Sequence, residues 1–166
     1  MEHSYPNAGS ALDVAAGLGR HALWLSEKSW KVTAVDVSEV AIGKLAESAR
    51  ALDVAIDLFA VDARDYDFQP AQFDLIVLFY HLDRSLFPAL VSALKPGGLF
   101  ICKMAVHFGS GDDLKQIHST PLGRNELLSL ITGLEILEHN ERPVRDRGVA
   151  EFAGRKVCSS YLGHGT

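Results

Sequence analysis

The glycine turn Gly17-Leu18-Gly19 and the two acids that flank it are the residues whose types and spacing best suit a chemical function. Asp13 stands in an apolar run four residues before Gly17, and Asp36 ends the next apolar run along the chain. Glycines let the backbone turn sharply and approach a ligand closely, and the start of a following helix offers unpaired N–H groups. A carboxylate at the tip of the second run can accept both hydroxyls of a ribose. The stretch is therefore typical of a nucleoside-binding site.

The runs around these residues predict the elements that position them. Apolar runs at 11–15 and 31–35 are expected as strands, and apolar residues at helical spacing over 20–28 predict a helix between them. Leu18 and Leu25 are expected in line with the buried side of that helix. The order strand, glycine turn, helix, strand is that of a βαβ unit.

The rest of the chain continues to alternate between helices and strands. Helices are expected at about 39–52 (with Ser38 as N-cap), 83–94 and 125–131, and strands at 55–61, 73–79, 99–105, 134–138 and 155–162. Pro88 fits its helix only in the first turn, and Lys95-Pro96-Gly97-Gly98 is expected to end that helix. The glycine-containing stretch 107–123 is expected to be a long loop, and the polar stretch 140–154 carries no clear pattern.

This alternation predicts an α/β fold with a doubly wound, mostly parallel sheet of about seven strands, the last antiparallel, in three layers. Residues 1–10 are short, polar and broken by Pro6 and Gly9, so they are expected as a flexible arm before a single domain over 11–166. Cys102 and Cys158 lie in apolar, strand-like runs and are expected as reduced core thiols.

Composition narrows the class of partner and the compartment. The 166 residues are 48% hydrophobic and 22% charged, as in an ordinary globular domain, and the net charge of −5 argues against a nucleic-acid partner. The chain starts without the basic and apolar regions of a signal peptide, and no apolar run is long enough to cross a bilayer. A cytoplasmic protein with no membrane partner is expected. The histidines lack the spacing of metal ligands, so no metal site is expected.

The pattern G-x-G-x-x-A at 17–22, with Asp36 near the required spacing, permits an NAD-dependent oxidoreductase. Asp13 counts against this interpretation, because a buried carboxylate costs several kcal/mol unless a cationic or hydrogen-bonding group meets it. A pyrophosphate on the glycine turn would add to that cost, whereas a ligand with an ammonium group would reduce it.

Five motifs occur in order at sensible spacing: DVAAGLGR at 13–20, AVDVS at 34–38, DA at 62–63, FDLIV at 73–77 and LKPGGLFI at 94–101. Together they resemble the S-adenosylmethionine-dependent methyltransferases of the Rossmann-like class over about residues 11–105. The first motif and the later GLEILE at 133–138 are similar to the small tellurite-resistance and thiopurine-type branch. That family often has glycine where Ala15 stands and cysteine where Ala16 stands, and it usually has an N-terminal helix over the cofactor, so the N-terminus here looks shortened.

The resemblance implies S-adenosylmethionine as cofactor, S-adenosylhomocysteine as product, and a role for each matching residue. Asp13 would contact the amino end of the cofactor's methionine and Asp36 the ribose hydroxyls. Asp62 would accept from the adenine amino group, and the backbone of Phe79 would lie near the transferring end. The cofactor-binding residues expected in this way are Asp13, Ala15, Ala16, Gly17, Gly19, Arg20, Asp36, Val37, Asp62, Ala63 and Phe79.

The function implied is transfer of a methyl group to a small molecule by in-line displacement at the sulfonium methyl. Tyr80, His81 and His107 follow the fourth and fifth expected strands and are the candidate catalytic bases, although a packing or rim role is the more common one for each such residue. Asp36 can merely cap the following helix, and Asp62 can be a turn residue. A module that binds the cofactor without catalysis is a further alternative. The loop 107–123 is expected to be the mobile cover of the site. A homo-oligomer is a further way in which the open site could be covered.

Overall fold

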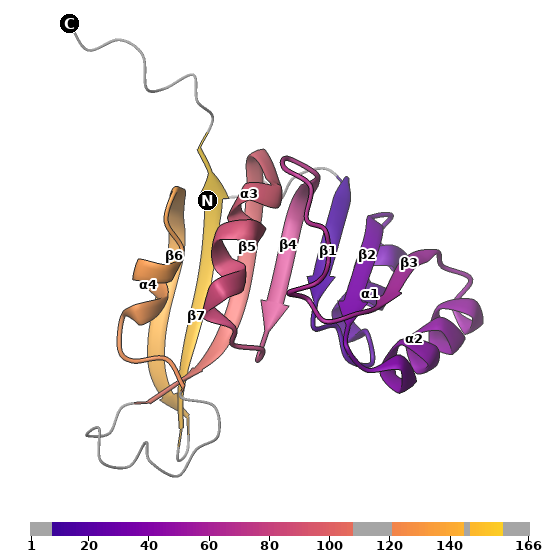
Figure 1. Cartoon of the computed structure of the whole chain (residues 1–166), viewed down its shortest axis with the longest axis horizontal. Coiled ribbons are helices and arrows are strands. Elements are labelled where there is room, and N and C mark those ends of the chain that lie inside the picture. The colour runs from indigo at the N-terminus through magenta and orange to yellow at the C-terminus, as the bar shows by residue number, and fades with distance from the viewer. Residues whose placement is uncertain (1–7, 108–120, 145–146, 158–166) are drawn as a thin grey trace, which may run out of the picture.

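Seven strands form a single sheet in the order β3-β2-β1-β4-β5-β7-β6 (Figure 1). The computed structural model describes residues 8–107, 121–144 and 147–157. Strands β1 to β5 pair in parallel, and β7 is antiparallel to both of its neighbours. The strands are β1 (Ser10–Val14), β2 (Lys31–Asp36), β3 (Ile56–Ala60), β4 (Phe73–Phe79), β5 (Leu94–Val106), β6 (Leu134–Val144) and β7 (Arg147–Lys156). The expected α/β sheet with an antiparallel last strand is confirmed.

Helices pack on both faces of this sheet and complete three layers. They are α1 (Arg20–Glu27), α2 (Glu39–Ala51), α3 (Phe87–Ala93), which follows the 3-10 turn η1 (Arg84–Leu86), and α4 (Glu126–Leu130). Strand β4 alternates between the two faces. Its Leu75 and Val77 pack with α1 and α2 on one face, and its Ile76 and Leu78 pack with α3 and α4 on the other. We call these the α1/α2 face and the α3/α4 face; α3 and α4 lie in front of the sheet in Figure 1.

Several local predictions are confirmed by the capping geometry. The Ser38 side chain accepts a hydrogen bond from the Ala41 N–H at 3.2 Å and so caps α2. Pro88 lies in the first turn of α3, where its missing N–H costs nothing. Leu18 was expected to align with the buried side of α1, and this is wrong. It lies in the loop before the helix and is 63% exposed.

Two strand predictions are also wrong. β5 begins at Leu94 rather than at the expected residue 99, and it includes Lys95-Pro96-Gly97-Gly98. The helix before it, α3, ends at Ala93, so the prediction that these residues end that helix is confirmed. A register shift against β4 between Phe73 and Leu75 accommodates these residues as a bulge. The final strand spans Arg147–Lys156 rather than 155–162, and it pairs with β6 as a long hairpin. β6 is mostly exposed and carries a continuous polar run over 138–142, so no alternating apolar pattern marks it as a strand.

Cys102 is a free, buried thiol within the α3/α4 core, and burial raises its pKa to about 12. Cys158, the residues 1–7 of the expected arm and residues 108–120 of the expected loop lie outside the described part of the chain. The helices of the described residues include none with the length and hydrophobicity needed to traverse a membrane.

Gly19 carries the packing between the glycine turn and α2. Its φ is 78°, and a Cβ placed there would collide with the Leu45 side chain of α2. We expect Gly19→Ala to lower the free energy of unfolding by about 2 kcal/mol, because a left-handed alanine and an overfilled contact add together. Gly17→Ala is the matched control: its φ is 55°, but no atom lies within 4 Å of the added methyl. Urea denaturation should show a clearly larger loss for Gly19→Ala; equal losses would mean that Leu45 simply moves aside.

Candidate functional site

The candidate site lies at the carboxyl edge of the parallel strands, where open α/β sheets bind their ligands. The segment between β1 and α1 makes an unusually tight turn there. Ala15, Gly17 and Gly19 have φ of 54°, 55° and 78°, so three of its five residues are left-handed. The Ala16 N–H donates to the Val35 carbonyl at 3.1 Å, which ties the turn to β2. Alanine reaches this conformation only with strain, so a glycine would fit position 15 more easily.

Asp36, the last residue of β2, holds the glycine turn and the start of α2 together. Its Oδ2 accepts from the Gly17 N–H at 2.7 Å, and its Oδ1 accepts from the Ser38 N–H at 2.8 Å. The helix cap itself is supplied by Ser38, so Asp36 is more than a capping residue. Each carboxylate oxygen keeps a second lone pair, with which it can accept a hydroxyl. Asp36 is the residue that the sequence analysis assigns to the ribose hydroxyls, and this assignment stays a prediction.

Asp13 is buried beneath the turn, with 1% of its surface exposed. Its Oδ2 accepts from the Ala22 N–H at 3.0 Å and satisfies one of the free donors at the start of α1. Burial raises the pKa of Asp13 to about 7, against the opposing effect of the Ala22 hydrogen bond, and the charge of Asp36 adds to the rise. Asp13 therefore has a structural role, because it accepts the Ala22 N–H at the start of α1. Its expected contact with the ammonium group of the cofactor stays a prediction.

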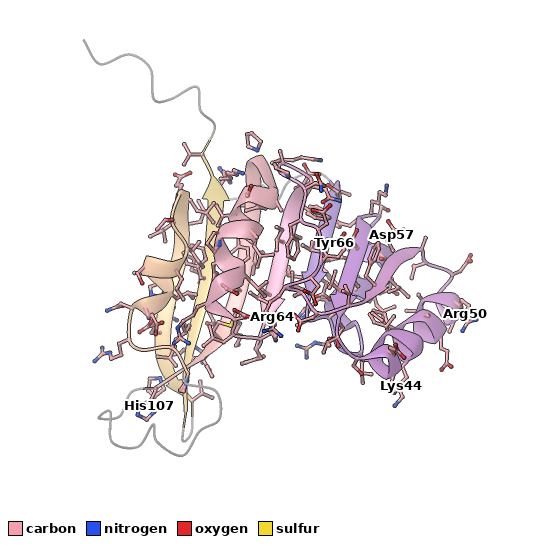
Figure 2. All side chains as sticks on the ribbon, viewed as in Figure 1. Lys44, Arg50, Asp57, Arg64, Tyr66 and His107 are labelled. Carbon is pink, nitrogen blue, oxygen red and sulfur yellow. The ribbon has the colours of Figure 1, made fainter. Side chains whose placement is uncertain are left out.

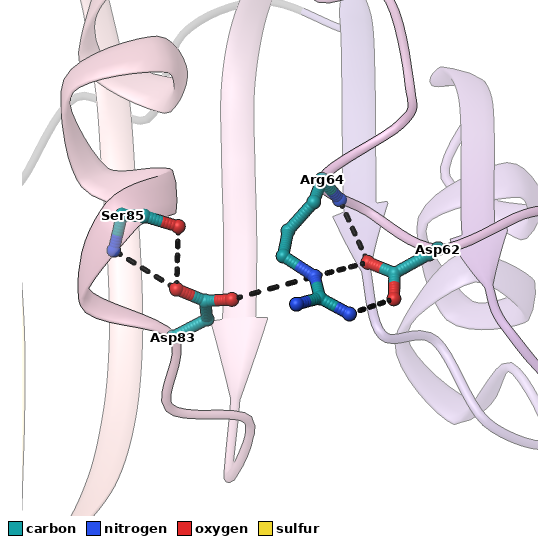
Figure 3. A network of polar contacts seen from close by, with 4 residues as sticks. All are labelled: Asp62, Arg64, Asp83 and Ser85. Atoms are coloured by element: carbon teal, nitrogen blue, oxygen red, sulfur yellow. Dashed lines mark hydrogen bonds and ion pairs between the residues drawn. The ribbon is translucent and has the colours of Figure 1, made fainter.

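Asp62, after β3, is held by an arginine that the sequence analysis did not single out. Arg64 donates from its backbone N–H and its Nε to Oδ1 at 2.9 and 3.0 Å, and from Nη2 to Oδ2 at 2.6 Å (Figure 3). The same guanidinium lies 3.8 Å from Asp83, which caps η1 by accepting from the Ser85 N–H. These contacts hold the pKa of Asp62 well below its usual range. They give Asp62 a turn-stabilising role, and an adenine amino group would have to share its oxygens with Arg64.

Other expected cofactor contacts lie along the same edge with different accessibility. Val37 is 70% exposed and accessible to an adenine ring, whereas Ala63 is only 8% exposed. Arg20 opens α1 with an exposed side chain. Phe79, at the end of β4, stacks on His21 of α1 with ring centroids 4.2 Å apart. Sequence analysis did not single out His21, which stands at a variable position of the glycine pattern.

The three candidate bases follow two neighbouring strands: Tyr80 and His81 follow β4, and His107 follows β5. Tyr80 is 60% exposed with a left-handed φ of 57°, and its N–H donates to the Lys103 carbonyl at 2.8 Å. His81 is exposed. Hydrogen bonds from Arg64 and Ser85 lower the pKa of Asp62 and Asp83, respectively, and His81 lies near enough to both carboxyls to contribute. His107 directly follows β5 and lies well apart from Arg64 (Figure 2). Its Nε2 is buried and has no hydrogen-bond partner among the described residues.

The fold is shared with several solved structures of low sequence identity. The [4+2]-cyclase SpnF matches with a TM-score of 0.80 at 20% identity, over 91% of this chain and 76% of that one. TehB from Haemophilus influenzae matches with 0.76 at 24% identity, over 89% and 57%. A SAM-dependent methyltransferase from Methanosarcina mazei matches with 0.74 at 18% identity, over 92% and 94%. This chain therefore spans little more than half of TehB. No curated protein matches it.

The sheet order, the strained glycine turn and the acid that ends β2 define a Rossmann-like methyltransferase fold. The family model described as a methyltransferase domain matches residues 11–98, more than half of the sequence. The chain belongs to this methyltransferase domain family, and its cofactor is S-adenosylmethionine. The resemblance inferred from the five motifs is confirmed.

Proposed function

We propose that this protein transfers the methyl group of S-adenosylmethionine to a small-molecule acceptor by in-line displacement. The observation that carries the proposal is the double hydrogen bond of Asp36 to the Gly17 and Ser38 N–H groups. It places one carboxylate against the strained turn, at the edge where a ribose has to be recognised. When bound, the cofactor supplies an already activated methyl group.

The residues of the chain therefore have to bind the cofactor and align the acceptor with the methyl group; they do not have to activate that group. Asp36 accepts the ribose hydroxyls, and the exposed Val37 lies against the adenine. Asp62 accepts the adenine amino group through the lone pairs that Arg64 leaves. The backbone at Phe79 lies near the transferring end. Alignment of the reacting atoms supplies most of the rate in such a displacement.

The acceptor decides whether a base is needed. A hydroxyl or amine acceptor requires proton removal, for which Tyr80, His81 and His107 remain the candidates, whereas a thiolate or a soft metalloid requires none. Tyr80 is the best placed of the three, because its backbone follows Phe79 directly and its side chain is 60% exposed. A second copy of the chain covering the open site is part of the same proposal.

A protein that binds the cofactor without transferring the methyl group is the second candidate. It is favoured by one observation: SpnF, which shares the fold at a TM-score of 0.80, is described as a [4+2]-cyclase. A fold shared at 20% identity does not fix the reaction that takes place on it.

Calorimetric titration with S-adenosylmethionine, S-adenosylhomocysteine and NAD tests the proposal. We expect both sulfur compounds to bind and NAD to fail. Binding of NAD alone would support the oxidoreductase instead. Transfer of label from methyl-labelled S-adenosylmethionine to thiol, amine and hydroxyl acceptors then separates an enzyme from a module that only binds.

A further inference from the structure

Three charged side chains lie side by side on the α1/α2 face of β5, β7 and β6. Lys103 of β5 pairs in register with Glu151 of β7. On β6, Asn140 pairs with Glu151, and Arg142 follows two residues later on the same face. Lys103 Nζ donates to Glu151 Oε1 at 2.7 Å, and Arg142 Nη2 donates to the same oxygen at 3.3 Å. We call this group the charged triad.

The triad has an excess of positive charge. Its two cations share one carboxylate, so the net charge is +1, and a guanidinium has further N–H donors beyond the one given to Glu151. The side chains are 27%, 30% and 50% exposed for Lys103, Glu151 and Arg142, which leaves them accessible to a ligand. Half-shielded charges interact more strongly with a ligand than fully solvated ones.

The triad also lies next to the place where methyl transfer is proposed. Lys103 pairs in register with Phe79 of β4, and the Tyr80 N–H donates to the Lys103 carbonyl. Adjacent strands lie about 4.8 Å apart, so Lys103 is one strand and Glu151 two strands from Phe79. Helices α1 and α2 pack against β1, β2 and β3, and the triad lies on the strands beyond them.

The opposite end of the sheet shows what a purely structural pair looks like. Lys95 of β5 donates to Asp74 of β4 at 2.7 Å, with side chains 40% and 30% exposed. This pair is balanced in charge, and Asp74 also accepts from the Ser10 N–H and hydroxyl, so its role is to join β1, β4 and β5. The triad, in contrast, keeps an unbalanced cation at the carboxyl end.

We propose that Lys103 and Arg142 bind an anionic group, a carboxylate, of the methyl acceptor, and that Glu151 offsets part of their positive charge. This inference rests on the proposed function, because it assigns the acceptor side of the same site. Arginine and lysine are suited to it, since a guanidinium forms paired charge-assisted hydrogen bonds with a carboxylate. The acceptor is thus a small acid whose nucleophilic atom lies near Phe79.

Calorimetric titration of the protein saturated with S-adenosylhomocysteine, first with benzoate and then with the neutral isostere benzamide, tests this assignment. We expect benzoate to bind at least tenfold more tightly than benzamide at low salt. Arg142→Gln and Lys103→Gln should each lose about tenfold in benzoate affinity. Lys95→Gln is the matched control and should bind benzoate as the unaltered protein does.

Glu151→Gln supplies a test of opposite sign. Removal of the carboxylate leaves both cations for the ligand, so benzoate should bind more tightly, whereas damage to the fold would weaken it. Benzoate that binds no better than benzamide, or that is weakened equally by Lys95→Gln, would overturn the proposal. Failure of the proposed function is visible separately, as absent binding in the initial titration with S-adenosylhomocysteine.

Discussion

Asp36→Ala is expected to weaken S-adenosylhomocysteine binding by about 10- to 100-fold. The change removes the acceptor of two charge-assisted hydrogen bonds from the ribose, which corresponds to about 1.5–3 kcal/mol. It also releases the Gly17 and Ser38 N–H groups, which donate to Asp36 at 2.7 and 2.8 Å. The turn between β1 and α1 is then no longer held in its binding geometry. Calorimetric titration measures the loss directly.

Two further variants separate ribose binding from support of the turn. Asp36→Asn keeps the size of the side chain but offers one carbonyl oxygen for two N–H donors, so its loss should lie between that of alanine and none. Asp57→Ala removes an exposed acid from the neighbouring strand β3 and should leave affinity unchanged. Unchanged binding in Asp36→Ala would refute the assignment of Asp36 to the ribose.

Strands β1, β2 and β4 were predictable because they are buried on both faces. Such strands appear as continuous apolar runs, and the predicted bounds of β1, α1 and β2 agree with the structure within about one residue. The hairpin of β6 and β7 was not predictable in the same way. Its α1/α2 face is half-exposed and carries Glu151 and Arg142, so the hydrophobic pattern is interrupted.

Within the candidate site, the sequence predicts which residues matter better than it predicts which residues contact one another. Asp36 could be singled out because an acid at a strand tip after a glycine turn has few other roles. The contact of Arg64 with Asp62 depends on the turn conformation, and the triad depends on the register between β5 and β7. Residue spacing predicts neither the turn conformation nor the long-range register, since both follow from the packing of the whole sheet.

The bulge at the start of β5 illustrates the same limit. Proline and paired glycines are usual at the end of a helix, which is why residues 95–98 are predicted to end one. In the structure Gly97 has a φ of 81°, and a Cβ on Gly98 would lie 2.9 Å from the Lys95 carbonyl. Gly97 therefore supplies a left-handed backbone and Gly98 a close backbone approach inside a strand, and the pairing with β4 reveals both uses.

The stability of the ligand-free protein is expected to fall as the pH rises from about 4 to above 7, and Asp13 is the cause. Burial raises its pKa to about 7 in the folded state, above the value of about 4 in the unfolded chain. The folded state binds this proton more tightly, so the stabilisation is complete below the lower value and is lost as the pH rises through the higher one. The loss is at most about 4 kcal/mol.

Asp13→Asn should abolish this dependence, because an amide is uncharged and its oxygen can still accept from the Ala22 N–H. Urea denaturation at pH 5 and pH 8 should show a smaller difference for Asp13→Asn than for the unaltered protein, with the variant more stable at pH 8. Asp74→Asn is the matched control: although burial opposes it, hydrogen bonds from Lys95 and Ser10 lower the Asp74 pKa, so that variant should keep the loss above pH 5.

The same variant tests whether Asp13 also meets the cofactor. An ammonium group beside Asp13 favours its ionised form, so S-adenosylhomocysteine should bind the unaltered protein more tightly at pH 8 than at pH 5. Asp13→Asn should bind more weakly at pH 8 and should lose this dependence. If both proteins respond to pH alike, Asp13 acts only as the acceptor that fixes the start of α1, and the methionine end of the cofactor is held by the turn that Asp36 supports.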